Sequence, residues 1–341
     1  MNEVTEANDV PLYRHHRSLA LIPHPRPALR ILFWGTPEFA AAPLRALLGE
    51  GQDVVGVVTQ PDRPQGRSRS VLIPSPVKLI ALEDGIPTLQ PEKPRGDAFM
   101  EEMRALAPDL SVVVAYGHIL PKAVIDLPPM GTLNIHASLL PALRGAAPIQ
   151  AAIRDGMRET GVSIMRMVPA LDAGPVLHTV TTELLPDETY GELQQRLAEL
   201  GAEALLEALA MLEASAARET PQDDALATYA PKFEREMARM DGTRSAEENA
   251  RVIRAYDPRP GAFTTLRGTD VKLFGATAVV DVPDAPAGPG CVLAADERGL
   301  LVACATGAVR ITDVQPSGKR RLAAAEWARG RGIAVGDVLG S

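Results

Sequence analysis

Residues 30–40, RILFWGTPEFA, place a short apolar run directly before a turn and a helix start. The run ILFW has the length and composition of a buried strand. Thr36, followed by Pro37 and Glu38, is typical of a helix start, because a threonine side chain can cap the first turn and proline fits the first helical position. A buried strand that leads straight into a helix indicates an α/β protein.

The same unit recurs along the next hundred residues. Apolar runs at 54–59, 110–115 and 132–135 read as further buried strands, with amphipathic helical patterns between them. A helix begins after Ser75 and stops before Gly85. We therefore predict a doubly wound, mostly parallel, Rossmann-like sheet, whose ligands should collect at the carboxyl ends of its strands.

The second half of the chain changes character. Residues 161–182 read as a hairpin with a turn at 169–175, and an amphipathic helix fills 188–214. A helix at 245–255 then precedes short strands separated by Gly and Pro, which predicts a small β-barrel of the OB-like kind. The expected organisation is a disordered extension (1–28), a catalytic α/β domain (29–217), a linker (218–239) and a C-terminal β-barrel (240–341).

Composition excludes several classes of protein. The 341 residues include two cysteines, Cys291 and Cys304, and the formal net charge is -8. Two isolated cysteines predict neither a disulfide framework nor a metal site. No apolar run reaches the roughly 20 residues that a membrane-spanning helix needs, so we expect a cytoplasmic protein. The acidic balance argues against nonspecific binding of polyanions, which leaves only local nucleic-acid contacts.

The strongest chemical feature is the pair Asn134 and His136 at the end of a predicted strand. Residues two apart on a strand share a face, so both side chains project together at the carboxyl end of the sheet. An amide and an imidazole there could stabilise an oxyanion and move a proton. Asp172, in the turn LDAG, could supply a carboxylate. A hydrogen-bonded pair in the core explains Asn134 and His136 equally well. Taken alone, Asp172 in a Gly-containing turn is better explained as an ordinary turn residue.

Other motifs narrow the chemistry. The first strand is followed by Gly35, Thr36, Pro37 and Glu38 rather than by GxGxxG, so a dinucleotide cofactor is disfavoured. No GxSxG segment supplies a nucleophilic serine. Two basic segments suit phosphate contacts but also fit a solvated surface; they are the loop 60–69, with Arg63, Arg67 and Arg69, and the cluster Lys319, Arg320 and Arg321.

Eight segments in order resemble the methionyl-tRNA formyltransferase family, from about residue 29 to the C-terminus. They read ILFWGTPEFA, TQPDRPQGR, SPVK, PDLSVVVAYGHILP, LNIHASLLPALRGAAPIQ, TGVSIMRMVPALDAGPVL, TYAPKFEREMARMD and IRAYDPRPGA. A single match would be weak evidence, whereas eight in order are specific.

The resemblance implies formyl transfer from 10-formyltetrahydrofolate to initiator methionyl-tRNA. In that mechanism the methionine amine attacks the formyl carbon directly, Asn134 and His136 hold the oxyanion, and Asp172 orients His136 and assists proton removal. It implies no metal and no membrane, and we expect a monomer. The implied folate-binding residues are Ser138, Leu139, Leu140, Pro141, Tyr116 and Gly117. The implied tRNA-binding residues are Arg63, Arg67, Arg69, Arg144, Lys319 and Arg320.

The chain departs from the family pattern at Ala142 and Leu143, which bear on contacts at the rim of the site, at Ala173 in the turn of Asp172 and at Ser68 in the arginine loop. The three residues Asn134, His136 and Asp172 are intact. Asn134, His136 and Asp172 form a catalytic trio that other families share. Related formyltransferases that act on a sugar nucleotide or a ribonucleotide amine have it, and so do formylfolate hydrolases. The QPDRP loop and the C-terminal region of about 100 residues favour tRNA. A noncatalytic tRNA-binding protein would have no need to keep the trio together.

Overall fold

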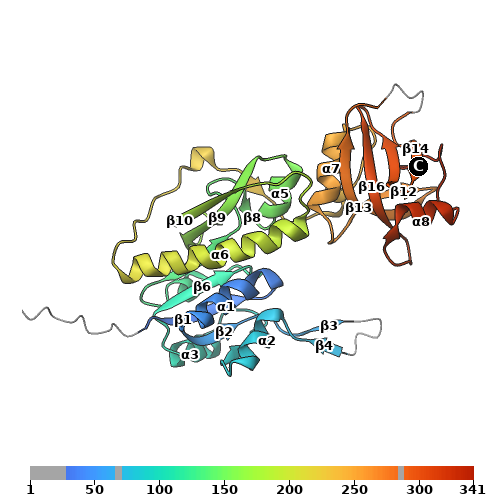
Figure 1. Cartoon of the computed structure of the whole chain (residues 1–341). Coiled ribbons are helices and arrows are strands. Elements are labelled where there is room, and N and C mark those ends of the chain that lie inside the picture. Colours follow the sequence, from blue (N-terminus) through green and yellow to red (C-terminus); the bar gives the residue numbers. More distant parts are fainter. Residues whose placement is uncertain (1–27, 66–70, 283–287) are drawn as a thin grey trace, which may run out of the picture.

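The computed structural model describes residues 28–65, 71–282 and 288–341 (Figure 1). The predicted extension, Arg67 and Arg69 therefore lie outside the described residues, except that residue 28 is included. The strands are β1 (Arg30–Gly35), β2 (Asp53–Val58), β3 (Arg63–Gln65), β4 (Val71–Ile73), β5 (Thr88–Leu89), β6 (Leu110–Val114), β7 (Thr132–His136), β8 (Arg144–Gly145), β9 (Glu159–Arg166), β10 (Val176–Glu183), β11 (Tyr229–Ala230), β12 (Ala262–Leu266), β13 (Thr269–Val279), β14 (Val292–Asp296), β15 (Gly299–Ala303), β16 (Ala308–Pro316) and β17 (Leu322–Ala323).

Eight α-helices and three short 3-10 helices complete the described part of the chain. The α-helices are α1 (Ala41–Gly49), α2 (Pro76–Glu83), α3 (Asp97–Ala105), α4 (Lys122–Ile125), α5 (Pro148–Arg154), α6 (Tyr190–Glu213), α7 (Ala246–Ala255) and α8 (Ala324–Arg329). The 3-10 helices are η1 (Glu38–Ala40), η2 (Asp224–Leu226) and η3 (Arg235–Ala238).

The larger domain is built on a seven-stranded sheet in the order β10-β9-β7-β6-β1-β2-β5. The five strands from β7 to β5 run parallel, whereas β9 pairs antiparallel with β7 and with β10. The predicted mostly parallel sheet is confirmed, and the hairpin predicted at 161–182 forms its antiparallel edge. Parallel strands end at the same edge, so the residues after β1, β2, β6 and β7 gather there.

Helices cover both faces of this sheet. Alternate residues of β1 enter two different cores: Ile31 and Phe33 pack with α1, α2 and α6, whereas Leu32 and Trp34 pack with α3 and α4. Figure 1 shows the long helix α6 lying across one face. A strand that is buried on both faces must be apolar at every position, which explains the uninterrupted run ILFW.

The two predicted helix starts have different outcomes. Ser75 caps α2, because its hydroxyl accepts a hydrogen bond from the Lys78 amide at 3.1 Å, as predicted. The cap predicted at Thr36 is wrong: its hydroxyl instead donates to the carbonyl oxygen of Tyr116 at 3.2 Å, and Pro37 precedes η1 without a side-chain cap. A short polar side chain can serve a distant backbone group as readily as a local one.

The predicted polar loop 60–69 contains part of a hairpin. Strands β3 and β4 pair antiparallel, with Arg63 opposite Ile73. The base of this hairpin is fixed by Lys78, whose ammonium donates to Asp62 at 2.6 Å and to Gln90 at 2.7 Å. The lysine bond lowers the pKa of the Asp62 carboxyl, with a smaller contribution from Gln90.

The C-terminal part is an antiparallel sheet in the order β12-β13-β16-β15-β14, with β17 beside β16 and α7 packed against it. Its edge strands β12 and β14 are linked by the end of the chain. The amide of Leu339 donates to the carbonyl oxygen of Gly290, just before β14, and the amide of Gly340 donates to the carbonyl oxygen of Thr265 in β12. This linkage closes the sheet, in agreement with the predicted small β domain. Within the described residues no helix is long and apolar enough to span a membrane.

The predicted linker, residues 218–239, packs against the larger domain. Thr220 forms an isolated bridge with Val176, and β11 pairs parallel with β8. Further along the junction, the amide of Gly191 at the start of α6 donates to the carbonyl oxygen of Asp257 at 3.0 Å. The linker therefore reaches the edge of the sheet where β7 ends.

Candidate active site

The site begins at the end of β7, where Asn134 and His136 project from the same face. Their neighbours Leu133 and Ile135 are buried in the core beneath α6, so the two polar side chains point to the other side. His136 is 5% exposed. The predicted placement of Asn134 and His136 on one face of the strand end agrees with the structure.

The His136 ring has one nitrogen committed and one available. Its Nε2 lies 3.0 Å from the carbonyl oxygen of Leu143 and its Nδ1 lies 3.7 Å from Oδ2 of Asp172. Because a carbonyl oxygen can only accept, Nε2 must carry the hydrogen. In the neutral ring Nδ1 therefore presents a lone pair on the side of the Asp172 carboxylate.

Asp172 is held in an uncommon backbone conformation. Its φ is 47°, in the left-handed region that asparagine and aspartate tolerate better than most residues. Its Oδ2 accepts a hydrogen bond from the Gly145 amide at 2.8 Å, and its side chain is 14% exposed. The turn therefore aims the carboxylate inward, at His136, in addition to reversing the chain.

The amide of Asn134 remains available for a ligand. The side chain is half-buried, and none of the hydrogen bonds between described residues involves it. A half-buried amide that has no protein partner is a suitable donor for an oxyanion. Together, the three predicted catalytic residues offer a donor, a base and a carboxylate at one edge of the sheet.

The predicted folate segment forms a hydrogen-bonded turn after β7. The Ser138 hydroxyl donates to the Ala142 carbonyl at 2.6 Å, and its own carbonyl accepts from the Ser163 hydroxyl at 2.8 Å. The Leu140–Pro141 peptide bond is cis. Leu139, Leu140 and Pro141 are half-buried, which leaves apolar surface at the rim of the site.

Tyr116 and Gly117 are predicted to line the folate pocket, but the Tyr116 side chain is buried in the core whereas Gly117 is exposed. The Tyr116 ring packs edge-on against Trp34 in the core beneath α3. Its hydroxyl is buried without a hydrogen-bond partner among the described residues, and burial raises its pKa to about 12. Gly117, with a φ of 93°, is exposed. Any contact of Tyr116 with a ligand would thus come from its backbone.

The predicted tRNA-binding residues differ in accessibility. Arg63, Lys319 and Arg320 are exposed. The Arg144 side chain is only 4% exposed, and its guanidinium donates to Gln222 and to Asp224. Arg144 stays a predicted tRNA-binding residue, although its nitrogens are engaged by Gln222 and Asp224, 78 and 80 positions later in the sequence.

Two linker residues at the site were missed from the sequence. Gln222 donates to the carbonyls of Asp172 and Gly174, and the Thr228 hydroxyl accepts from the Leu143 amide at 2.9 Å. The linker thus contacts the turn of Asp172 and the residue that binds His136. The segment TYAPK, which begins with Thr228, was the available signal, but nothing in it identified a partner.

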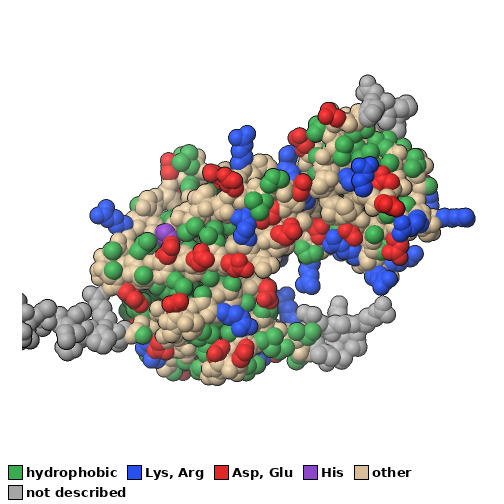
Figure 2. All heavy atoms as spheres, in the orientation of Figure 1, with side chains coloured by type: hydrophobic (Ala, Val, Ile, Leu, Met, Phe, Trp, Pro, Cys, Tyr) green, Lys and Arg blue, Asp and Glu red, His purple; other side chains and the backbone are tan. Residues whose placement is uncertain are grey.

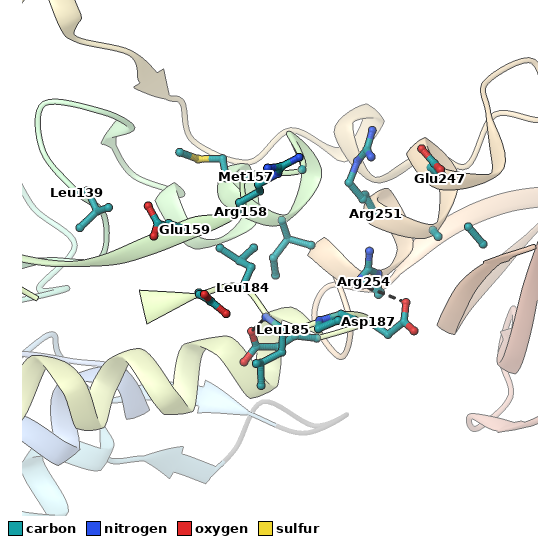
Figure 3. A pocket seen from close by; sticks show the side chains of 17 residues that line it. Leu139, Met157, Arg158, Glu159, Leu184, Leu185, Asp187, Glu247, Arg251 and Arg254 are labelled. Atoms are coloured by element: carbon teal, nitrogen blue, oxygen red, sulfur yellow. Dashed lines mark hydrogen bonds and ion pairs between the residues drawn. The ribbon is translucent and has the colours of Figure 1, made fainter. Parts of the chain in front are cut away.

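A separate cavity of about 1130 Å³ lies between α5, the end of β10 and α7 (Figure 3). Figure 3 shows Arg254 approaching Asp187, with a nitrogen–oxygen distance of 3.7 Å. Of the predicted site residues, Leu139 lines this cavity and the catalytic trio does not. Among the described residues, no group of three His, Cys, Asp or Glu side chains could hold a metal ion.

Known proteins share this architecture over nearly the whole chain. The chain is 48% identical to methionyl-tRNA formyltransferase of Methylococcus capsulatus over 313 residues, which cover 92% of this chain and 100% of that protein. It is also 48% identical to the enzyme of the same name from Pseudomonas paraeruginosa, with 92% and 100% covered.

Two solved structures show the same fold at lower identity. HypX from Aquifex aeolicus in complex with tetrahydrofolic acid has a TM-score of 0.61 at 23% identity, over 88% of this chain. The chain spans about half of HypX, 47% of its length. An N-formyltransferase from Helicobacter canadensis, in complex with folinic acid and dTDP-3-aminofucose, has a TM-score of 0.64 at 14% identity, over 84% of this chain and 99% of that one.

Family models match both parts of the chain. The model described as formyl transferase covers residues 29–209, and the model described as formyl transferase, C-terminal domain, covers residues 232–332. With relatives at 48% identity along their full length, these matches establish that the chain belongs to the formyl transferase family.

Proposed function

We propose that this protein transfers the formyl group of 10-formyltetrahydrofolate to the amino group of initiator methionyl-tRNA. The observation that carries the chemistry is the distance of 3.7 Å between Nδ1 of His136 and Oδ2 of Asp172. Asn134 lies on the same face of the strand end, and its amide has no hydrogen-bond partner among the described residues. The relatives named methionyl-tRNA formyltransferase support the choice of acceptor. The folate complex of HypX supports a folate-derived donor.

In the proposed reaction each residue of the trio has one task. The amine forms a bond to the formyl carbon while the bond from that carbon to the folate nitrogen breaks. Asn134 donates a hydrogen bond to the formyl oxygen as negative charge develops there. His136 accepts at Nδ1 the proton that the amine loses, and Asp172 stabilises the resulting imidazolium. That proton can then be returned to the leaving nitrogen, so no covalent enzyme intermediate is required.

We assign His136 a narrower task than the resemblance implies. The resemblance implies that His136 shares the oxyanion with Asn134. Because Nε2 donates to Leu143, the nitrogen that faces Asp172 is Nδ1, which in the neutral ring has no hydrogen to donate. We therefore assign oxyanion stabilisation first to Asn134 and the proton transfer to His136.

Exposed cations on both domains support binding of a tRNA. Arg63 on β3 and the pair Lys319 and Arg320 after β16 are exposed. Figure 2 shows Lys and Arg side chains around the hollow between the two domains. Arg67 and Arg69 lie outside the described residues and stay predicted contacts. We leave Arg144 out of the proposed surface because its guanidinium is buried and bonded to Gln222 and Asp224. Local cations of this kind allow an acidic chain to bind phosphates.

The acceptor is tested by competition between amines. Purified protein is supplied with labelled 10-formyltetrahydrofolate and with initiator methionyl-tRNA, elongator methionyl-tRNA or a nucleotide-linked amino sugar. Formylmethionine on initiator tRNA is the expected product. Transfer to the amino sugar without formylation of either tRNA would disprove the acceptor while leaving the family chemistry intact.

A further inference from the structure

Gln222 contacts the catalytic turn from the interdomain linker. Its side-chain nitrogen donates to the carbonyl of Asp172 at 2.8 Å and to that of Gly174 at 2.7 Å. Its side-chain oxygen accepts from Nε of Arg144 at 3.0 Å and from Nη2 at 2.8 Å. Carbonyls only accept and a guanidinium only donates, so these four bonds fix the orientation of the amide.

These bonds complete a ring around Asp172. The carboxylate of Asp172 accepts from the amide of Gly145, and the adjacent residue, Arg144, holds Gln222. Gln222 in turn holds the backbone of Asp172. The same short segment, 144–145, therefore fixes the carboxylate directly and the backbone of the turn through the linker.

The backbone conformation of Asp172 has to be held by neighbouring contacts. Asp172 has a φ of 47°, a conformation that costs free energy for a residue with a Cβ and persists where surrounding contacts enforce it. Leu171 before it is exposed, so packing on that side provides little restraint. Without the two bonds from Gln222, the backbone could relax and move the carboxylate away from His136.

We propose that Gln222 is a positioning residue for formyl transfer, which sets the Asp172 carboxylate against His136. This inference rests on the proposed catalytic role of Asp172. It also makes the linker part of the active site, although the linker separates the two matched family domains.

The decisive variant is Gln222→Glu. A glutamate keeps the chain length and the oxygen that Arg144 requires, but it has no hydrogen for the two carbonyls. If Gln222 serves only as a partner for Arg144, turnover stays at the wild-type value and the inference is overturned. If Gln222 positions Asp172, we expect kcat to fall by about 10- to 100-fold with KM for both substrates unchanged, since misplacement of a catalytic group by about 1 Å can cost about 100-fold.

Two further variants serve as controls for the positioning role of Gln222. Gln222→Met removes all four bonds without adding a charge, and it should show the same loss of kcat even where the glutamate variant fails to fold. Asp223→Asn is the matched control, because Asp223 is exposed and its carboxylate caps the Ala225 amide at 2.9 Å without contacting Asp172. Its kcat should equal that of the wild type.

A double-mutant comparison separates this inference from the proposed function. In an Asp172→Ala background, Gln222→Glu should cause no additional loss, because the carboxylate it positions is absent. A full additional loss would show that Gln222 acts elsewhere and would overturn the inference alone. Wild-type turnover of Asp172→Ala itself would refute the catalytic role of Asp172, and the inference would fall with it.

Discussion

Arg144→Met tests the structural role that burial assigns to this arginine. The side chain is 4% exposed, and methionine retains most of its aliphatic packing while removing the guanidinium. The two lost bonds to Gln222 share one acceptor oxygen, which is left without a donor. The bond to Asp224 contributes little because that carboxylate is 82% exposed.

These terms give an expected loss of about 1–3 kcal/mol in the free energy of unfolding, the range for a charged hydrogen bond whose partner, here the half-buried Gln222, is left unsatisfied. Urea denaturation followed by circular dichroism measures it. Arg158→Met is the control: Arg158 is exposed and its side chain has no ion pair among the described residues, so a change within about 0.5 kcal/mol is expected.

An Arg144→Met variant as stable as the control would refute the structural role of Arg144. A raised KM for methionyl-tRNA at unchanged stability would restore the view of Arg144 as a contact to tRNA, which is the role that the resemblance implies.

Three other changes test single features. Tyr116→Phe should keep wild-type kcat and stability at neutral pH, since it removes a buried hydroxyl without a partner among the described residues. Because burial raises the pKa of Tyr116 to about 12, the wild type should lose stability as pH rises from about 10 to 12. The phenylalanine variant should not show this loss in thermal scans. Gly174→Ala should lower the melting temperature and kcat together, because a Cβ there would lie 1.8 Å from the Arg166 carbonyl oxygen; unchanged values would mean that the turn can shift freely. Ser245→Ala should cost about 1 kcal/mol of unfolding free energy by removing the cap of α7, as read from urea denaturation, with kcat unaffected.

The regular elements were predictable because local chemistry determines them. The run ILFW has the length and composition of a strand covered on both faces, and Ser75 is positioned to cap α2. The closeness of Asn134 and His136 follows from the alternation of a strand. These features require no knowledge of distant residues.

The misses all depend on partners far along the chain. The sequence cannot show that Arg144 is enclosed by Gln222, 78 positions later. It also cannot show which side of the sheet receives Tyr116, since both faces are covered by apolar helices. The domain boundaries and the monomeric state remain predictions.

Asp172→Asn tests the catalytic account most directly. Asparagine can still accept the hydrogen bond from Gly145, so the turn is retained, but its neutral amide no longer stabilises a proton on His136. We predict that the single-turnover rate of formyl transfer to methionyl-tRNA falls by about 100- to 10,000-fold. A rate equal to that of the wild type, in a folded variant, would contradict the proposed role of the His136 and Asp172 pair.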